Sequence, residues 1–226
     1  MTPTIVRALH DTREKLRSHY INNADQEAKW LLQDIACFDS SDFFSVKDKQ
    51  LSEEESKRLD LYVRQRIAGM PLSRIFGYQE FWGLKLYLSE DTLDPRQDTE
   101  LIPEIALKSL PKDFSGTILD LGTGSGCIAL ALLSEFPQLH CIAIDKSFSA
   151  VCQARYNAIM NHLDSRFHGV CSDWTSPIKG RFPLIVSNPP YIKRSDLTNL
   201  DENVREFDPK LALDGGESGF DSLKKI

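Results

Sequence analysis

A glycine-rich turn between residues 118 and 126 constrains the fold of this chain more than any other feature. These residues read Ile-Leu-Asp-Leu-Gly-Thr-Gly-Ser-Gly, an apolar strand pattern that runs directly into three alternating glycines, and helical spacing follows from Cys127. Glycines at such a turn let the backbone bend tightly and come close to a bound nucleotide. The same turn can also serve only to join a strand to a helix, so its neighbours must decide between the two readings.

The chain after Gly116 alternates short β-branched runs with helical runs. Strands are predicted at 117–121, 141–144, 167–171 and 184–187, and helices at 127–135 and 147–161. This alternation predicts βαβ units, and therefore an α/β fold with a doubly wound, Rossmann-like parallel sheet that carries helices on both faces.

The first 75 residues have a different pattern, with apolar residues at helical spacing. The positions that carry it are Ile5, Leu9, Leu16, Tyr20, Ala28, Leu31, Leu32, Ile35, Leu59, Val63 and Ile67. A capping box is predicted at Ser52 and Glu55, and Gly69 and Pro71 should end that helix. A β-hairpin is predicted at 78–88 and a helix at 99–110. We therefore expect a helical substrate-recognition domain at 1–75, a hairpin linker at 76–95 and a catalytic domain at 96–226.

Composition excludes several classes of protein. Of the 226 residues, 41% are hydrophobic and 27% are charged, which favours folded structure throughout. A net charge of −6 argues against a general nucleic-acid binder, because phosphate contacts need surplus Lys and Arg. The five cysteines contain no C-x-x-C pair, so neither a metal site nor a disulfide framework is expected, and reduced thiols suit the cytoplasm. Charged residues come too early for a signal peptide, and no apolar run is long enough to span a membrane.

The cofactor is predicted from the glycines and one downstream carboxylate. Asp145 ends the strand after the glycine turn, where its side chain can accept hydrogen bonds from ribose hydroxyls; alternatively it only caps the next helix. The G-x-G-x-G spacing differs from the G-x-G-x-x-G of dinucleotide enzymes, and Asp120 suits a ligand that bears an ammonium group. The sequence thus favours S-adenosylmethionine. The predicted cofactor contacts in the turn are Gly122, Thr123, Gly124, Ser125 and Gly126.

The acceptor is predicted from the Asn-Pro-Pro-Tyr tetrapeptide at 188–191, which directly follows an apolar strand. Strand carboxyl ends line the ligand crevice of such sheets, so Asn188, Pro189, Pro190 and Tyr191 should face the methyl donor and the substrate. An amide nitrogen is a poor nucleophile that must be held in one orientation. The Asn188 side-chain oxygen and the Pro189 carbonyl can each accept one N–H of an NH₂ group, and both bonds strengthen as the nitrogen becomes positive. Tyr191 offers a planar face for the flat acceptor group.

Asp173 and Trp174 follow the strand predicted at 167–171, also at its crevice end. There a carboxylate can accept a hydrogen bond from the adenine amino group, and an indole can pack on the ring. A surface turn with a tryptophan anchored in the core is an equally good interpretation.

Seven blocks of the chain resemble the HemK/PrmC family, the protein-(glutamine-N5) methyltransferases of peptide chain release factors. They are Pro-Leu at 71–72, Gly-Tyr-Gln-Glu-Phe at 77–81, Pro-Arg at 95–96, Asp-Thr-Glu at 98–100, Asp-Leu-Gly-Thr-Gly-Ser-Gly at 120–126, Asn-Pro-Pro-Tyr-Ile at 188–192 and Pro-Lys-Leu-Ala-Leu-Asp-Gly-Gly at 209–216.

The resemblance implies a class I S-adenosylmethionine methyltransferase domain and an N-terminal helical domain that helps to hold a release factor. It implies that residues 122–126 and Asp145 bind the cofactor, that Trp174 lies beside the adenine, and that 188–191 bind the glutamine of a Gly-Gly-Gln loop. Two departures stand out. Gln97 replaces a usual proline, and similar domains continue through further strands after the Asp-Gly-Gly segment, so we expect the C-terminal part of the catalytic domain to be missing.

The leading hypothesis is methyl transfer from S-adenosylmethionine to the glutamine N5 of release factors in the cytoplasm, without direct nucleic-acid or membrane binding. An amino-group methyltransferase acting on a nucleic-acid base also uses Asn-Pro-Pro-Tyr, but it would need a basic groove. A non-catalytic fragment or binding module is the other alternative. A dehydrogenase leaves residues 188–191 unexplained.

Overall fold

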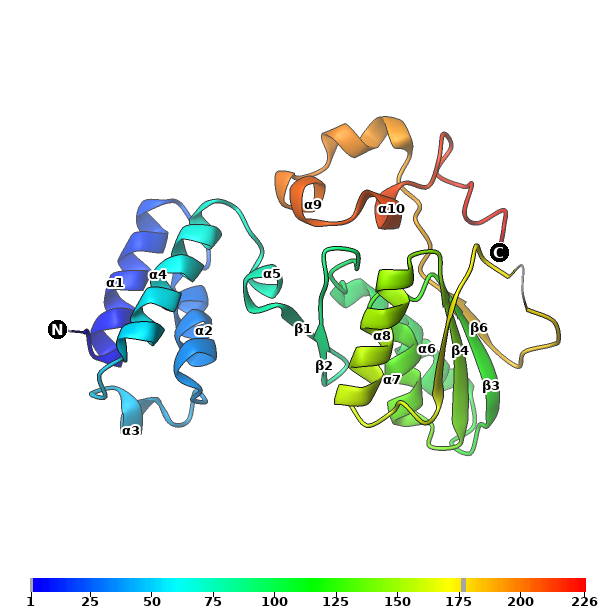
Figure 1. Ribbon diagram of the computed structural model, residues 1–226, viewed down its shortest axis with the longest axis horizontal. Coiled ribbons are helices and arrows are strands. Elements are labelled where there is room, and N and C mark those ends of the chain that lie inside the picture. The colour runs from blue at the N-terminus through cyan, green and yellow to red at the C-terminus, as the bar shows by residue number, and fades with distance from the viewer. Residues whose placement is uncertain (1, 176–177) are drawn as a thin grey trace. The chain divides into compact units, whose positions relative to one another are not determined.

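The computed structural model describes residues 2–175 and 178–226 (Figure 1). The chain divides into two compact units, Met1–Phe76 and Gly77–Ile226. The hairpin predicted as a linker belongs to the second unit, and the division into three segments stays a prediction. No helix among the described residues is both long enough and apolar enough to cross a membrane.

The first unit is helical, as the apolar spacing predicts. Its helices are α1 (Ile5–Ser18), α2 (Ala24–Ala36), α3 (Phe43–Val46), α4 (Glu53–Ile67) and α5 (Leu72–Phe76). The capping box at the start of α4 is confirmed: the Glu55 amide donates to Ser52 Oγ at 3.1 Å, and the Ser52 amide donates to Glu55 Oε2 at 2.6 Å. The assignment of Tyr20 to the apolar face is wrong. It lies beyond the end of α1 with a positive φ of 59°, which turns its side chain away and leaves it 91% exposed.

The second unit opens with the predicted hairpin, in which β1 (Tyr78–Phe81) pairs antiparallel with β2 (Leu84–Tyr87). Both turn residues, Trp82 and Gly83, have positive φ, the conformation that suits a two-residue turn between twisted strands. Trp82 is bulky for this conformation. Its backbone amide donates to Glu100 at 2.8 Å and its indole donates to Glu135 at 2.7 Å, which fastens the turn to the rest of the unit.

A four-stranded parallel sheet in the order β5-β4-β3-β6 forms the centre of the second unit (Figure 1). The strands are β3 (Gly116–Leu121), β4 (Leu139–Asp145), β5 (Phe167–Cys171) and β6 (Ile185–Ser187). The predicted α/β class, the parallel pairing and all four predicted strands are confirmed. Because the strands run parallel, Leu121, Asp145, Cys171 and Ser187 all lie at one edge of the sheet.

In the part of the chain that the structure describes, the three helices that pack on the sheet all lie on one face of it. They are α6 (Leu101–Ser109), α7 (Cys127–Glu135) and α8 (Phe148–Met160), which share one apolar cluster with Ile118 and Cys141. The alternate residues Leu119 and Leu121 point to the other face. We predicted helices on both faces. Among the described residues, this second face is instead covered by the crossover from β5 to β6, through Trp174, Ile178 and Phe182.

Two further segments lead to the site, and the first of them differs from its prediction. The helix predicted at 99–110 begins as a 3₁₀ turn, η1 (Gln97–Glu100), and continues as α6. After β6 the chain forms η2 (Arg194–Asn199), α9 (Glu202–Phe207) and α10 (Lys210–Leu213). A parallel bridge between Ile192 and Asp214 then returns the chain to the end of β6.

Candidate active site at the carboxyl ends of the strands

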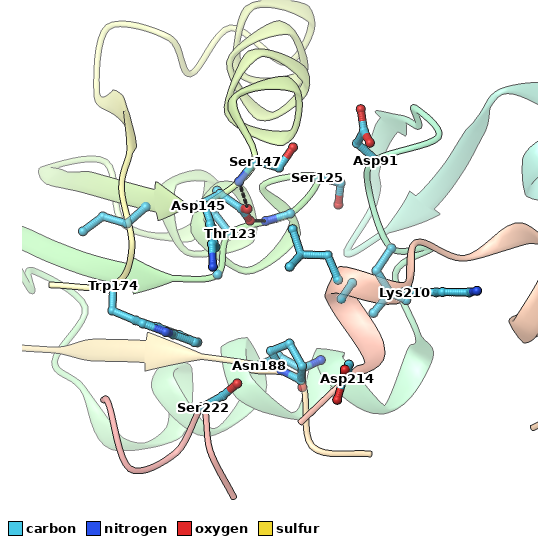
Figure 2. Close-up of a pocket in the computed structure, with 18 of the residues that line it drawn as sticks. Asp91, Thr123, Ser125, Asp145, Ser147, Trp174, Asn188, Lys210, Asp214 and Ser222 are labelled. Atoms are coloured by element: carbon cyan, nitrogen blue, oxygen red, sulfur yellow. Dashed lines mark hydrogen bonds between the residues drawn. The ribbon is translucent and has the colours of Figure 1, made fainter. Parts of the chain in front are cut away.

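A cavity of about 550 Å³ lies in the second unit, where the carboxyl ends of the parallel strands meet (Figure 2). This volume is within the range of small-molecule sites, roughly 300–1,000 Å³. Figure 2 shows Thr123 and Asp145 on one side of the cavity and Asn188 on the opposite side, with Trp174 at one end. Three motifs that are separate in the sequence therefore line one cavity.

The glycine-rich turn supplies one wall, through Gly122, Thr123, Gly124 and Ser125. Gly122 and Gly124 have φ values of 73° and 55°, and a Cβ added to either would meet nothing within 4 Å. Both glycines are thus explained by backbone conformation, and they leave open space for a ligand beside the turn.

Gly126 has a different role from the first two glycines. It is not among the residues that line the cavity, and an added Cβ would lie 3.2 Å from Ala154 Cβ and 3.3 Å from Leu130 Cδ1. Its lack of a side chain lets the start of α7 pack closely against α8. A contact of Gly126 with the cofactor stays a prediction.

Asp145, the last residue of β4, lines the cavity beside the turn. Its Oδ2 accepts a hydrogen bond from the Gly124 amide at 2.8 Å, and its Oδ1 accepts one from the Ser147 amide at 2.9 Å. A carboxylate has about four acceptor positions, so two remain for a ligand. The two interpretations of Asp145 are therefore compatible, because it orders the residues before α8 and also faces the cavity.

Asp120 lies beneath the turn rather than in the cavity. Its side chain is fully buried, is absent from the lining, and accepts a 2.7 Å hydrogen bond from Thr123 Oγ1. Burial raises the pKa of Asp120 to about 7, with a smaller contribution from the charge of Asp145 and partial compensation by the Thr123 bond. A contact of Asp120 with an ammonium group of the ligand stays a prediction, because Asp120 is not among the residues that line the cavity.

Asp173 and Trp174 line the cavity from the loop after β5. Trp174 also packs against the apolar cluster of Leu119, Leu121 and Ile144 on the second face of the sheet. Trp174 thus both packs against the core and lines the cavity, and its contact with the adenine stays a prediction. The Asp173 carboxylate lies 3.9 Å from Lys225 Nζ, another lining residue.

The tetrapeptide at 188–191 begins directly after β6, and only part of it lines the cavity. Asn188 and Pro190 are lining residues, whereas Pro189 and Tyr191 are not, and Tyr191 is 65% exposed. Asn188 Nδ2 donates a 3.2 Å hydrogen bond to Thr99 Oγ1. This bond uses the donor end of the amide and leaves its oxygen available as an acceptor. Substrate contacts of Pro189 and Tyr191 stay predictions.

Several lining residues come from segments whose residue types did not predict a functional role. They are Asp91, Leu93, Pro95, Arg96 and Thr99 before α6, and Lys210, Leu211, Ala212, Asp214, Gly216, Asp221, Ser222 and Lys225 near the end of the chain. Many of them fall in the blocks at 95–100 and 209–216 that carry the family resemblance, which is the signal that could have found them. No cluster of metal-ligating side chains is present in residues 2–175 and 178–226.

The second of these segments supports the tetrapeptide through its backbone. Gly215 donates to the Ile192 carbonyl at 2.8 Å, and a Cβ on Gly215 would lie 2.8 Å from the Tyr191 Cα and carbonyl carbon. Such distances do not occur for real side chains, so a glycine is required here. The Arg96 guanidinium pairs with Asp208 and joins the two segments.

Comparison with known proteins agrees with this geometry. Residues 89–207 match the family model of the methyltransferase small domain, and residues 7–77 match that of the PrmC N-terminal domain. The release factor glutamine methyltransferase of Agrobacterium fabrum is 41% identical over 99% of this chain and 78% of its own length. That of Escherichia coli is 39% identical over 89% of this chain and 72% of its own length.

The chain belongs to the release factor glutamine methyltransferase family. S-adenosylmethionine is accordingly its methyl donor. The open space beside Gly122 and Gly124 and the cavity-facing carboxylate of Asp145 fit this cofactor. Among solved structures, a human methyltransferase 10 domain-containing protein is 19% identical over 52% of this chain and 61% of that chain, with a TM-score of 0.40.

Proposed function

We propose that this protein transfers a methyl group from S-adenosylmethionine to the side-chain amide nitrogen, N5, of the glutamine in the Gly-Gly-Gln motif of peptide chain release factors. One observation carries the proposal. The Asn188 amide lines the same cavity as the glycine turn and Asp145, with its donor end occupied by Thr99. The Asn188 side-chain oxygen, a hydrogen-bond acceptor for a substrate amide, thus lies across the cavity from the residues that suit the cofactor.

The cofactor side of the cavity holds the donor in one position. When bound, S-adenosylmethionine supplies an electrophilic methyl group on a sulfonium. Gly122 and Gly124 would let the backbone approach it, Asp145 would accept hydrogen bonds from its ribose hydroxyls, and Trp174 would form a wall beside its adenine, since all four residues line the cavity.

The acceptor side orients a weak nucleophile. The Asn188 side-chain oxygen and the Pro189 carbonyl each accept one N–H of the glutamine amide, which directs the nitrogen lone pair at the methyl group. These bonds strengthen as positive charge develops on nitrogen, so they stabilise the transition state more than the ground state. The extra proton leaves to water after transfer. A strong general base is not needed.

The partner assignment rests on the family. The relatives named above are release factor glutamine methyltransferases, and the PrmC N-terminal domain match covers the helical unit. The helical unit helps to hold the release factor, and the reaction takes place in the cytoplasm. Direct binding of nucleic acid is not part of the proposal, because a net charge of −6 provides no surplus of cations for phosphates.

The test is to incubate the purified protein with labelled S-adenosylmethionine and a release factor, and separately with DNA and RNA. Label should enter the release factor at the glutamine of Gly-Gly-Gln, as located by mass spectrometry of the peptides, and a release factor with alanine at this glutamine should take up none. Label in DNA or RNA alone would favour the nucleic-acid alternative and overturn the proposal.

A variant tests the mechanism. Asn188→Ala should lower kcat by roughly 10²–10³-fold, the usual loss when one group that stabilises developing charge is removed. Its thermal melting should stay close to that of the original protein. Asn199→Ala is the matched control, because Asn199 is exposed and does not line the cavity. A normal rate for Asn188→Ala would refute the orientation mechanism.

A further inference from the structure

Thr99 and Asn188 meet in the cavity although 89 positions separate them in the chain. Thr99 is buried, with 7% of its surface exposed, and lies in η1, while Asn188 directly follows β6. Both residues line the cavity, and the threonine hydroxyl accepts the 3.2 Å hydrogen bond from Asn188 Nδ2. The residue types around Thr99 do not by themselves predict a catalytic or binding role.

The orientation of the Asn188 amide decides whether it can serve the proposed reaction. Rotation of the carboxamide by half a turn exchanges its oxygen and its NH₂ group. With Nδ2 directed at Thr99, the oxygen remains for the N–H groups of a substrate amide. In the reverse orientation two NH₂ groups would oppose each other, both of them donors. A threonine hydroxyl can accept from Nδ2 or donate to the oxygen; in the structure it accepts from Nδ2, and this bond holds the amide in the orientation that the reaction needs.

Hydrogen bonds and an ion pair on both sides of Thr99 hold its backbone in place, and they therefore restrict the position of its hydroxyl. The Thr99 amide donates to the Arg96 carbonyl at 3.0 Å, and the Arg96 side chain pairs with buried Asp208. On the other side, Glu100 accepts the 2.8 Å bond from the Trp82 amide in the hairpin turn. Side chains locked by such neighbours hold a reacting group more precisely than a mobile loop does.

We propose that Thr99 is a positioning residue, which holds the Asn188 carboxamide with its oxygen presented to the substrate amide. The inference rests on the proposed function, because it names the residue through which the same site orients its acceptor. Thr99 does not touch the reacting atoms in this account; it acts through Asn188.

Three threonine variants test the role in the methylation assay. Thr99→Val keeps the shape of the side chain but cannot accept a hydrogen bond, and should lower kcat roughly tenfold, the rate equivalent of one net hydrogen bond. The KM for S-adenosylmethionine should change little. Thr99→Ser keeps the hydroxyl and should restore most of the rate. Thr117→Val is the control, because Thr117 lies at the opposite end of β3, outside the cavity lining.

A double-mutant cycle distinguishes an effect of Thr99 that acts through Asn188 from a loss of activity that does not depend on Asn188. In the Asn188→Ala background, Thr99→Val should have no further effect on kcat. Three outcomes would overturn the proposal. The tenfold loss of kcat from Thr99→Val could persist in the Asn188→Ala background, Thr99→Val alone could leave kcat unchanged, or Thr99→Ser could be as slow as Thr99→Val.

NMR of the side-chain amide tests the Thr99–Asn188 hydrogen bond independently of the methylation reaction. The Asn188 side-chain NH₂ signals, identified by their loss in Asn188→Ala, should shift and exchange faster with solvent in Thr99→Val but not in Thr99→Ser. Unchanged signals in Thr99→Val would refute the positioning role whatever the substrate is. A protein that shows these NMR changes but methylates no release factor would instead refute the proposed function.

Discussion

Asn157 donates a 2.8 Å hydrogen bond from its side-chain Nδ2 to the backbone carbonyl of Ser125, in the glycine-rich turn. The same amide also meets the hairpin: Oδ1 accepts from the Tyr87 amide at 2.8 Å, and Nδ2 donates to the Tyr87 carbonyl at 3.0 Å. One fully buried side chain on α8 thus joins β2 to the turn that faces the cofactor cavity. Its amide has the donor and the acceptor that these backbone groups need.

Asn157→Ala should therefore destabilise the second unit. Each buried backbone group that loses its partner costs about 1–3 kcal/mol. The free energy of unfolding from urea denaturation measures the effect. Asn161→Ala is the comparison, because the half-buried Asn161 side chain donates to the Lys85 carbonyl at 3.0 Å and to the Asn157 carbonyl at 2.9 Å, and its loss should cost clearly less than that of the fully buried Asn157. An equal decrease in the free energy of unfolding for the two variants would show that the buried hydrogen bonds of Asn157 do not contribute more than those of Asn161.

Asp145→Ala should weaken S-adenosylmethionine binding by more than tenfold. The substitution removes the carboxylate that faces the cavity and the acceptor of the Gly124 and Ser147 amides, and hydrogen bonds to charged groups contribute about 1.5–3 kcal/mol each. Isothermal titration calorimetry gives the dissociation constant. Asp113→Ala, at an exposed position outside the lining, should bind as the original protein does. An unchanged constant for Asp145→Ala would remove this residue from the site.

Asp120 should make stability fall as pH rises. Its pKa is about 7 in the folded protein and 3.8 in the reference state, so between these values the folded state keeps a proton that the unfolded state has lost. The contribution of Asp120 to the free energy of unfolding is fully present below about pH 4, and it falls by roughly 1.4 kcal/mol per pH unit until about pH 7. Asp120→Asn cannot titrate. The difference in unfolding free energy between the two proteins should follow this slope, and a difference that is constant from pH 4 to pH 7 would contradict the buried carboxyl.

Gly215→Ala should disturb the tetrapeptide loop. The new Cβ would lie 2.8 Å from Tyr191 backbone atoms, which cannot rotate away, and displacement of a site by about 1 Å can cost roughly 10²-fold in rate. Methylation kinetics measure the loss. Gly169→Ala is a matched control: its Cβ also meets an atom at 2.8 Å, but that atom is the side-chain Cγ1 of Val151, away from the cavity. Similar activity in both variants would mean that the loop tolerates the shift.

The local pattern of the sequence was sufficient for much of this protein. Alternating strand and helix patterns predicted the parallel sheet, the glycine turn predicted the cofactor wall, and Asn188 was placed at the end of a strand that does reach the cavity. These features depend on periodicity, on glycine conformation and on the rule that parallel strands end at one edge, and all of them act over a few residues.

Only the tertiary structure decided the partners of those residues. The burial of Asp120, the contact of Gly215 with Tyr191 and the hydrogen bond from Asn188 to Thr99 depend on the packing of distant segments around the sheet. No local periodicity encodes these contacts, because they depend on how segments far apart in the chain pack together. The sequence thus determined that the glycine turn, Asp145 and Asn188 lie at strand ends, whereas packing brought Thr99 to the Asn188 amide.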